Sequence, residues 1–321
     1  MKVMDLIADV GGTNIRLALL DGNNQYDVEC FKCNDFESLE AVVAHYLDDK
    51  EQVTVSDACF GVAGPVHGEV FTMTNLGWTF SAQSLKAKIG FDNVYFINDY
   101  TAISMSIPLL THSDLSVIHP AKSEEAAPRI ICGPGTGLGV AQLIKVGDFY
   151  ECISGEGGHG EFAPNNLRQL KVLEALMVKF EHVSAERLLS GQGIVNIYQS
   201  LAAIENIEPQ QFDASQISAR YINGSDPLCI EAMELFCDVL AQFLGNMVLN
   251  SGAFGGVYIA GGILPRIIDY IDTERFISAY SKKGRFKNYV LNAPIYLITQ
   301  EQPGLIGACV YLNQEKRKGN I

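Results

Sequence analysis

The sequence contains few charged residues, and basic residues are the minority among them. Charged residues make up 19% of the 321-residue chain and hydrophobic residues 48%, whereas the usual charged share is about 25%. Such a composition can bury a large core, which excludes disorder for the whole chain. The length corresponds to roughly two domains. Because 23 basic residues stand against 37 acidic ones, for a net charge of −14, we expect no nucleic-acid partner bound through a broad basic surface.

Cysteine pairs of the kinds that bind zinc or form disulfide frameworks are lacking. The eight cysteines are too sparse for a disulfide framework, and most lie among apolar residues, where cysteine acts as a small hydrophobe. Cys30 and Cys33 have the spacing of a zinc pair, but no second pair completes four ligands. We therefore expect a solvent-edge strand at this position. Asp5 and Asp9 interrupt the apolar N-terminal run, which argues against a signal peptide.

One stretch is free of charge over a length that would span a bilayer, from Val239 to Pro265. Gln242, Asn246 and Asn250 interrupt it, together with six glycines. A buried helix that ends near Gly252, followed by a short buried strand, explains this pattern better. We expect no membrane partner and a cytoplasmic protein.

Apolar strands alternate with amphipathic helices, which is typical of an α/β fold. A strand, a glycine turn and a returning strand open the chain, and the same outline recurs after Arg129 and, in part, after Val257. The expected strands cover residues 3–10, 15–20, 28–33, 58–63, 94–97, 130–132, 140–146 and 257–260. The expected helices cover 36–47 (capped by Asn34 or Asp35), 100–110, 167–180, 192–204, 228–249, 263–271 and 304–314.

Two of the glycine turns have the composition of phosphate-binding turns. In the first, Asp9 precedes the run Gly11-Gly12-Thr13; glycines let the backbone approach a phosphate, and the carboxylate could hold Mg²⁺ through water. An ordinary hairpin is the better interpretation of one such turn alone. Its recurrence at Gly135-Thr136-Gly137 favours two turns that clamp the phosphates of a nucleotide. Because no lysine follows either turn, neither is a P-loop.

Residues 155–160 match the dinucleotide pattern G-x-G-x-x-G, but they do not fit its chemistry. Glu156 would repel a pyrophosphate, and Phe162-Ala-Pro164 follows where a helix should begin. Glu156, His159 and Glu161 suit a neutral polyol, whose hydroxyls donate to carboxylates. A solvated glycine loop is an equally good interpretation of these residues alone.

Asn98 and Asp99 end a buried strand and precede a helix. Taken alone, Asp99 is best interpreted as a helix cap. Ligands nevertheless bind at the carboxyl ends of strands in open α/β sheets. At such an end Asp99 could accept a proton from an attacking hydroxyl.

Nearly the whole chain resembles one family, the bacterial ATP-dependent glucokinases of the actin-like, sugar-kinase and heat-shock-ATPase fold group. The matching stretches occur in the family's order and are specific when taken together. They are Asp9-Val-Gly-Gly-Thr-Asn14, Phe60-Gly-Val-Ala-Gly-Pro65, Thr74-Asn75-Leu-Gly-Trp78, Ile97-Asn-Asp-Tyr-Thr-Ala102, Gly133-Pro-Gly-Thr-Gly-Leu-Gly139, Glu156-Gly-Gly-His159 with Phe162-Ala-Pro164, Val183-Ser-Ala-Glu-Arg-Leu-Leu-Ser190 and Ile259-Ala-Gly-Gly-Ile263.

The resemblance implies an α/β, two-domain actin-like ATPase (ribonuclease H-like) fold with a cleft between the domains. The small domain would comprise residues 1–110 and 301–321, and the large domain residues 111–300. The implied reaction transfers the γ-phosphoryl group of ATP, with Mg²⁺, to the 6-hydroxyl of glucose, as the entry step of glycolysis. A homodimer is also implied.

The resemblance further assigns roles to individual residues. Asp99 would be the general base, and glucose would be bound by Asn98, Asp99, Glu156, His159 and Glu186. Without the resemblance, Glu186 is a plain exposed helix acid. The ATP-binding residues would be Ala8, Asp9, Val10, Gly11, Gly12, Thr13, Gly133, Gly135, Thr136, Gly137, Gly261 and Gly262, with Asp9 also holding Mg²⁺ through water.

The sequence leaves two alternatives to a glucose kinase. One is a kinase for fructose, mannose or an amino sugar, and the other is a sugar-sensing regulator without turnover. Such a regulator is expected to carry a DNA-binding segment ahead of Asp9, where eight residues stand. The cysteine-and-histidine zinc motif of the broader repressor and kinase family is missing, because Cys152 and His159 have no Cys-x-Cys partner nearby. We therefore expect no zinc.

Overall fold

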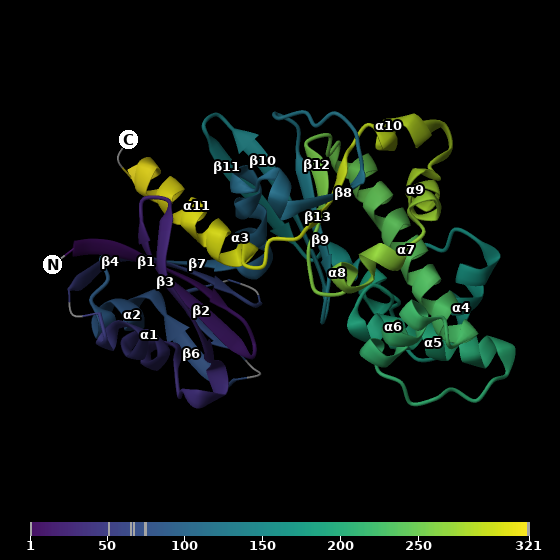
Figure 1. The fold of residues 1–321 in the computed structure, drawn as a ribbon, viewed down its shortest axis with the longest axis horizontal. Coiled ribbons are helices and arrows are strands. Elements are labelled where there is room, and N and C mark those ends of the chain that lie inside the picture. Colours follow the sequence, from purple (N-terminus) through teal and green to yellow (C-terminus); the bar gives the residue numbers. More distant parts are fainter. Residues whose placement is uncertain (1, 51, 65, 67, 74–75, 320–321) are drawn as a thin grey trace. The chain divides into compact units, whose positions relative to one another are not determined.

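The computed structural model describes residues 2–50, 52–64, 66, 68–73 and 76–319. Pro65, Thr74 and Asn75, which belong to two of the matching stretches, lie outside the described residues. The chain divides into two compact units (Figure 1), the first formed by residues 1–111, 147–154 and 300–321 and the second by residues 112–146 and 155–299.

The first unit is built on a mixed sheet in the order β3-β2-β1-β4-β7. β1 pairs antiparallel with β2 and parallel with β4, and β7 continues the parallel part. The bounds are β1 Lys2–Val10, β2 Asn14–Asp21, β3 Asn24–Lys32, β4 Val53–Val62 and β7 Asn93–Asn98, with a separate hairpin of β5 Val70–Met73 and β6 Trp78–Ser81.

Helices cover both faces of this sheet, because β1 is apolar on both sides. Leu6 and Ala8 belong to one buried cluster, which includes residues of α1 (Leu39–Asp48) and α2 (Ala82–Ile89). Ile7 belongs to the opposite cluster, with α3 (Asp99–Ser106) and α11 (Pro303–Gly319). A sheet covered on both faces is expected where parallel strands are connected by helices.

Two of the predicted helices need correction, one in its cap and one in its length. Asn34 and Asp35 lie in a 3₁₀ turn, so neither caps α1; the cap is Ser38, whose backbone is extended and whose side chain accepts from the Ala41 amide. The stretch 263–271 forms only the short α8 (Leu264–Ile267) and a 3₁₀ turn, so the predicted continuous helix is wrong.

The second unit repeats the hairpin-and-parallel arrangement of the first. The strands β10-β9-β12-β13-β8 lie side by side in that order, with β9 antiparallel to β10 and parallel to β12. The repeat expected from the sequence is therefore present. The bounds are β8 Leu115–His119, β9 Arg129–Pro134, β10 Leu138–Val146, β12 Gly256–Ile259 and β13 Ile295–Ile298.

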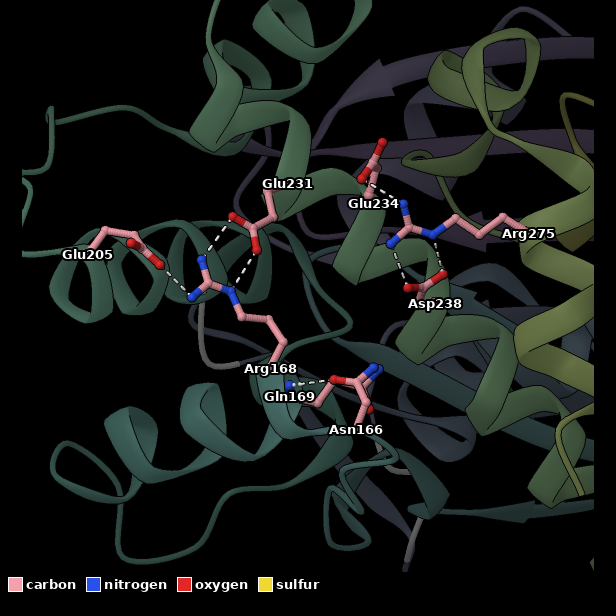
Figure 2. Close-up of polar contacts among 8 residues, drawn as sticks. All are labelled: Asn166, Arg168, Gln169, Glu205, Glu231, Glu234, Asp238 and Arg275. Atoms are coloured by element: carbon pink, nitrogen blue, oxygen red, sulfur yellow. Dashed lines mark hydrogen bonds and ion pairs between the residues drawn. The ribbon is translucent and has the colours of Figure 1, made fainter.

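The long helix α7 forms the centre of the helical part of this unit and ends as expected, with Gly252 in the left-handed region at φ +63°. Two arginines attach neighbouring helices to it (Figure 2): Arg168 pairs with Glu231 and Glu205, and Arg275 with Glu234 and Asp238. No helix among the described residues could cross a membrane. The bounds are α4 Leu167–Met177, α5 Gly191–Glu205, α6 Ala214–Asn223, α7 Pro227–Ser251, α9 Thr273–Ser281 and α10 Lys287–Leu291.

The segment 147–154, most of β11 (Phe149–Gly155), belongs to the first unit, whereas the sequence-based boundary placed it in the larger domain. A reciprocal pair of hydrogen bonds joins this segment to α11: the Tyr150 amide donates to Gln314 Oε1, and Gln314 Nε2 donates to the Tyr150 carbonyl. These residues are far apart in sequence, so no local pattern indicates the pairing.

We expect Lys316→Met to destabilise the first unit. Lys316 bridges the carboxylates of Asp5 and Asp57, whose side chains are only 11% and 9% exposed. Methionine keeps the apolar stem but leaves both carboxylates without this cation. The loss should be about 1–3 kcal/mol, between the values for exposed and buried pairs. Urea unfolding followed at the single tryptophan, Trp78 in β6, measures it.

Lys318→Met is the matched control on the same helix. Lys318 pairs with Glu151 and Glu315, whose side chains are 50% and 23% exposed, so its loss should cost under about 1 kcal/mol. Equal losses in the two variants would contradict the assignment of Lys316 as the residue that fastens α11.

Candidate active site

Asn98, not Asp99, caps helix α3. Its Oδ1 accepts hydrogen bonds from the amides of Tyr100 and Thr101, and its Nδ2 donates to the Gly64 carbonyl. The cap interpretation of Asp99 is therefore wrong. Because Oδ1 is engaged, Asn98 retains mainly its second amide hydrogen for a ligand.

Asp99 is the first residue of α3, directly after the carboxyl end of β7. Burial raises the pKa of its carboxyl to about 6, and the negative charge of Asp9 acts in the same direction. Hydrogen bonds, including one from the Tyr100 amide at 3.0 Å, partly oppose the shift in pKa. Asp99 is therefore a carboxylate that can exchange a proton near neutral pH.

Asp9 lies near the end of β1, against the start of α11. A Cβ on Gly304 would be 3.0 Å from the Asp9 carboxylate. Burial raises the pKa of Asp9, opposed by the charge of Arg16. Among the described residues no group of three histidine, cysteine or acidic side chains could hold a metal ion. Mg²⁺ is commonly held by one or two carboxylates and substrate phosphates, and Asp9 fits that kind of site.

The turn after β1 is tied down on both sides. The Gly11 amide donates to the Asn14 carbonyl at 2.9 Å, the Cys33 thiol donates to the Gly11 carbonyl, and the Cys33 amide donates to the Thr13 carbonyl. Ala8 and Val10 are fully buried in β1, so only their backbone could serve a ligand.

The second glycine turn is closed on itself and lies against α5. The Gly135 amide donates to the Gly137 carbonyl, and the amide of Gly191, the first residue of α5, donates to the Gly135 carbonyl. Gly261, at φ +87°, follows β12 and approaches so closely that a Cβ would be 2.5 Å from the Pro134 carbonyl oxygen. The structure therefore brings Gly133–Gly137 together with Gly261, and its neighbour Gly262 faces open space.

Glu156, His159 and Glu186 are also brought together. His159 Nε2 lies 4.0 Å from one carboxylate oxygen of each acid. Backbone bonds hold the two segments together, since the Ala185 amide donates to the Gly160 carbonyl and Glu161 pairs with Ser184. The loop is thus not an isolated solvated turn. Glu186 lies in a 3₁₀ turn with a side chain 26% exposed, so its interpretation as an exposed helix acid is wrong.

A cavity of about 180 Å³, missed by the sequence analysis, opens between α5, α6 and the segment after Gly262. Its lining is mainly apolar, with Ile194, Ile222 and Ile263, and polar groups come from Ser218 and Arg266. The periodic apolar residues of α6 could have indicated that helix, but no local signal places it beside Ile263.

Comparisons with known proteins agree on one family. The family model described as Glucokinase matches residues 6–315. The chain is 43% identical to the glucokinase of Colwellia psychrerythraea over 98% of this chain and 97% of the relative, and 44% identical to that of Pectobacterium atrosepticum over 96% and 97%. The crystal structure of a glucokinase from an Antarctic psychrotroph is similar at TM-score 0.91 and 35% identity, covering 98% and 100% of the two chains.

Asp99→Asn should stabilise the first unit at alkaline pH and not at acidic pH. The folded pKa of about 6 lies above the ordinary value of 3.8, so protonation favours the fold. The contribution of Asp99 to the free energy of unfolding is fully present below about pH 4 and is lost as the pH rises through about 6. Asparagine mimics the neutral form, and the gain should be roughly 1–3 kcal/mol at pH 8. Urea unfolding at pH 8 and pH 4, followed at Trp78, measures it.

Asp148→Asn, at an exposed turn of the same unit, is the control. If Asp99→Asn shifts stability equally at both pH values, or lowers it at pH 8, burial of a charged Asp99 is not the cause.

Proposed function

The chain belongs to the glucokinase family, and from this premise we propose how its residues transfer the γ-phosphoryl group of ATP to the 6-hydroxyl of glucose. The chain is an enzyme of that class, a kinase with the two-domain actin-like ATPase fold. The observation that supports the division of roles is the half-buried Asp99 at the carboxyl end of β7, with its raised pKa.

Asp99 is the proposed general base. Its carboxylate accepts the proton of the sugar 6-hydroxyl as that oxygen attacks the γ-phosphorus and the bond to the β-phosphate oxygen breaks. A base works best when its pKa lies near the working pH, and burial brings the pKa of Asp99 to about 6. Asn98 fixes the start of α3, and so the position of this base, through its cap.

Glu156, His159 and Glu186 are the proposed glucose ligands of the second unit, and Asn98 and Asp99 those of the first. Their proximity around His159 supports this assignment for the second unit. Carboxylates accept from hydroxyls and do not repel a neutral sugar. Exposure of Glu156 and His159 leaves their polar atoms available to a ligand.

The phosphates of ATP are proposed to bind at the backbone of residues 8–13 and of Gly133, Gly135, Thr136 and Gly137. Open space beside Gly135 and Gly262 supports this. The adenine is proposed to occupy the cavity beside Ile263 and Arg266, which has the apolar walls that a base needs. A glucokinase from Streptomyces griseus, 16% identical to this chain, has been solved with glucose and AMPPNP.

Asp9 is the proposed magnesium residue, acting through water. When bound, Mg²⁺ neutralises charge on the β- and γ-phosphates. The Asp9 carboxylate would orient the water shell of the ion from its buried position at the end of β1.

A cytoplasmic homodimer is the proposed physiological state. All eight cysteines are free, as is usual in a reducing compartment. One face of α4 exposes Leu167, Leu170 and Met177, and the C-cap residue Val178 is also exposed; contiguous apolar faces often mark interfaces.

The test of the function is ADP release in a coupled assay across glucose, fructose, mannose and glucosamine. Glucose should give the highest kcat/KM. If another hexose gives a higher kcat/KM, the protein is still a sugar kinase, but glucose is not its preferred substrate. If no hexose in the panel causes ADP release, the proposed function is rejected.

Asp99→Asn should abolish turnover and leave glucose bound, because asparagine keeps the shape but accepts no proton. We expect kcat to fall about 10²–10⁴-fold, with glucose affinity measured by calorimetry near that of the wild type. In the wild-type enzyme kcat/KM should fall as the pH drops below about 6, because Asp99 becomes protonated. A near-normal kcat in the variant would remove Asp99 from the role of base.

Glu156→Ala should weaken binding of glucose more than binding of one particular deoxyglucose. Each hydrogen bond to a charged acceptor is worth about 1.5–3 kcal/mol, or roughly ten- to a hundredfold in affinity. An analogue that lacks the partner hydroxyl has already lost the bond, so the mutation costs it little. Calorimetry with 2- and 3-deoxyglucose measures this. If the variant binds glucose and every deoxy analogue more weakly than the wild type by the same factor, Glu156 makes no contact with the sugar.

A further inference from the structure

The need for glycine at position 137 comes from a neighbouring side chain and not from its own backbone conformation. Gly137 is not among the residues with positive φ, so its conformation does not require glycine. A Cβ at this position would lie 2.6 Å from Glu186 Oε2 and 3.4 Å from Glu186 Cδ. The missing side chain therefore makes room for the Glu186 carboxylate.

The same carboxylate is held by Leu138, the first residue of β10, which directly follows the turn. The Leu138 amide donates to Glu186 Oε2 at 2.8 Å, while Oε1 lies 4.0 Å from His159 Nε2. One oxygen thus rests on the proposed phosphate turn, and the other faces the proposed sugar ligands.

The sugar loop also packs on the strand that leaves this turn. A Cβ on Gly158 would overlap the Leu138 carbonyl oxygen, and one on Gly157 would lie 3.3 Å from Val140 Cβ. Both polar groups of the Leu138 backbone therefore face the sugar-binding segments, the amide toward Glu186 and the carbonyl toward Gly158.

We propose that Gly137 and the Leu138 amide position Glu186 for the sugar, so that Gly137 sets glucose affinity although it lies in the phosphate turn. This inference rests on the proposed function of Glu186. The atom that meets an added Cβ is the far end of a flexible side chain. Alanine should therefore displace the carboxylate from the Leu138 amide without unfolding the turn.

The experiment compares Gly137→Ala with Gly135→Ala in the same turn, where a Cβ meets nothing within 4 Å. Glucose affinity is measured by calorimetry without nucleotide, and KM for ATP is measured with saturating glucose. Gly137→Ala should weaken glucose binding roughly ten- to a hundredfold, the effect of losing a hydrogen bond to a charged group, and any rise in its KM for ATP should be smaller than that of Gly135→Ala. Gly135→Ala should show the opposite pattern, with a raised KM for ATP and unchanged glucose binding.

A double-mutant cycle with Glu186→Ala identifies the route of the effect. If Gly137 acts through Glu186, Gly137→Ala should cause no further loss of glucose affinity when Glu186 is already alanine. An equal further loss in that background, or a rise confined to KM for ATP, would overturn the inference. Wild-type protein that neither binds nor phosphorylates glucose would instead reject the proposed function.

Folding provides a second readout. If Gly137→Ala alone lowers Tm, adding it to Glu186→Ala should cause no further fall, because Glu186→Ala removes the atoms that the new Cβ meets. A Tm of the double variant below that of Glu186→Ala alone would show that Gly137 serves the backbone of the turn and would contradict the assignment.

Discussion

The reactive end of the first unit depends on how closely α11 approaches α3. A Cβ on Gly307 would overlap the Ala102 carbonyl, and Gly304, one turn earlier, leaves space for the Asp9 carboxylate. Larger residues at these positions would push α11 away from the helix that begins at Asp99. Water would then reach the Asp9 carboxylate, and burial is the main cause of its raised pKa. Helix α11 therefore contributes to the burial of Asp9, whose negative charge in turn raises the pKa of Asp99.

The two glycine turns share one outline but are stabilised by different means. In the first unit the turn after β1 is fastened by the Cys33 thiol and amide, and its flanking acid, Asp9, is buried beside α11. In the second unit the turn after β9 is hydrogen-bonded to α5 through Gly191, and the acid that lies against it in space is Glu186. Repetition of a strand, a turn and a returning strand thus supplies two frameworks. The contacts made by each turn determine which ligand its neighbouring carboxylate can serve.

The elements that sequence analysis located are those whose signals are local. Strand runs such as 3–10 and 257–260, and Asp99 after a buried strand, need only neighbouring residues for their interpretation. Ser38 was missed as a cap because Asn34 and Asp35 are equally good cap residues by type, and only tertiary structure places them in a 3₁₀ turn. Glu186 had no local signal either, because its partner, the Leu138 amide, is 48 positions away. The resemblance to a family supplied that residue, and the structure supplied its partner.

The acidity of the chain explains why backbone groups dominate the proposed ATP site. With a net charge of −14, and with Asp9, Asp99 and Glu186 among the residues proposed to serve the substrates or the metal, a nucleoside triphosphate would meet repulsion. Arg168 and Arg275 are engaged by acids of α5 and α7 (Figure 2) and so brace helices. Glycine turns offer amides and bring no side-chain charge, and a divalent cation offsets the phosphates. The same carboxylates suit a neutral sugar, whose hydroxyls need acceptors, so acidic side chains are compatible with the proposed glucose ligands, and the proposed ATP site relies on backbone amides and a metal ion.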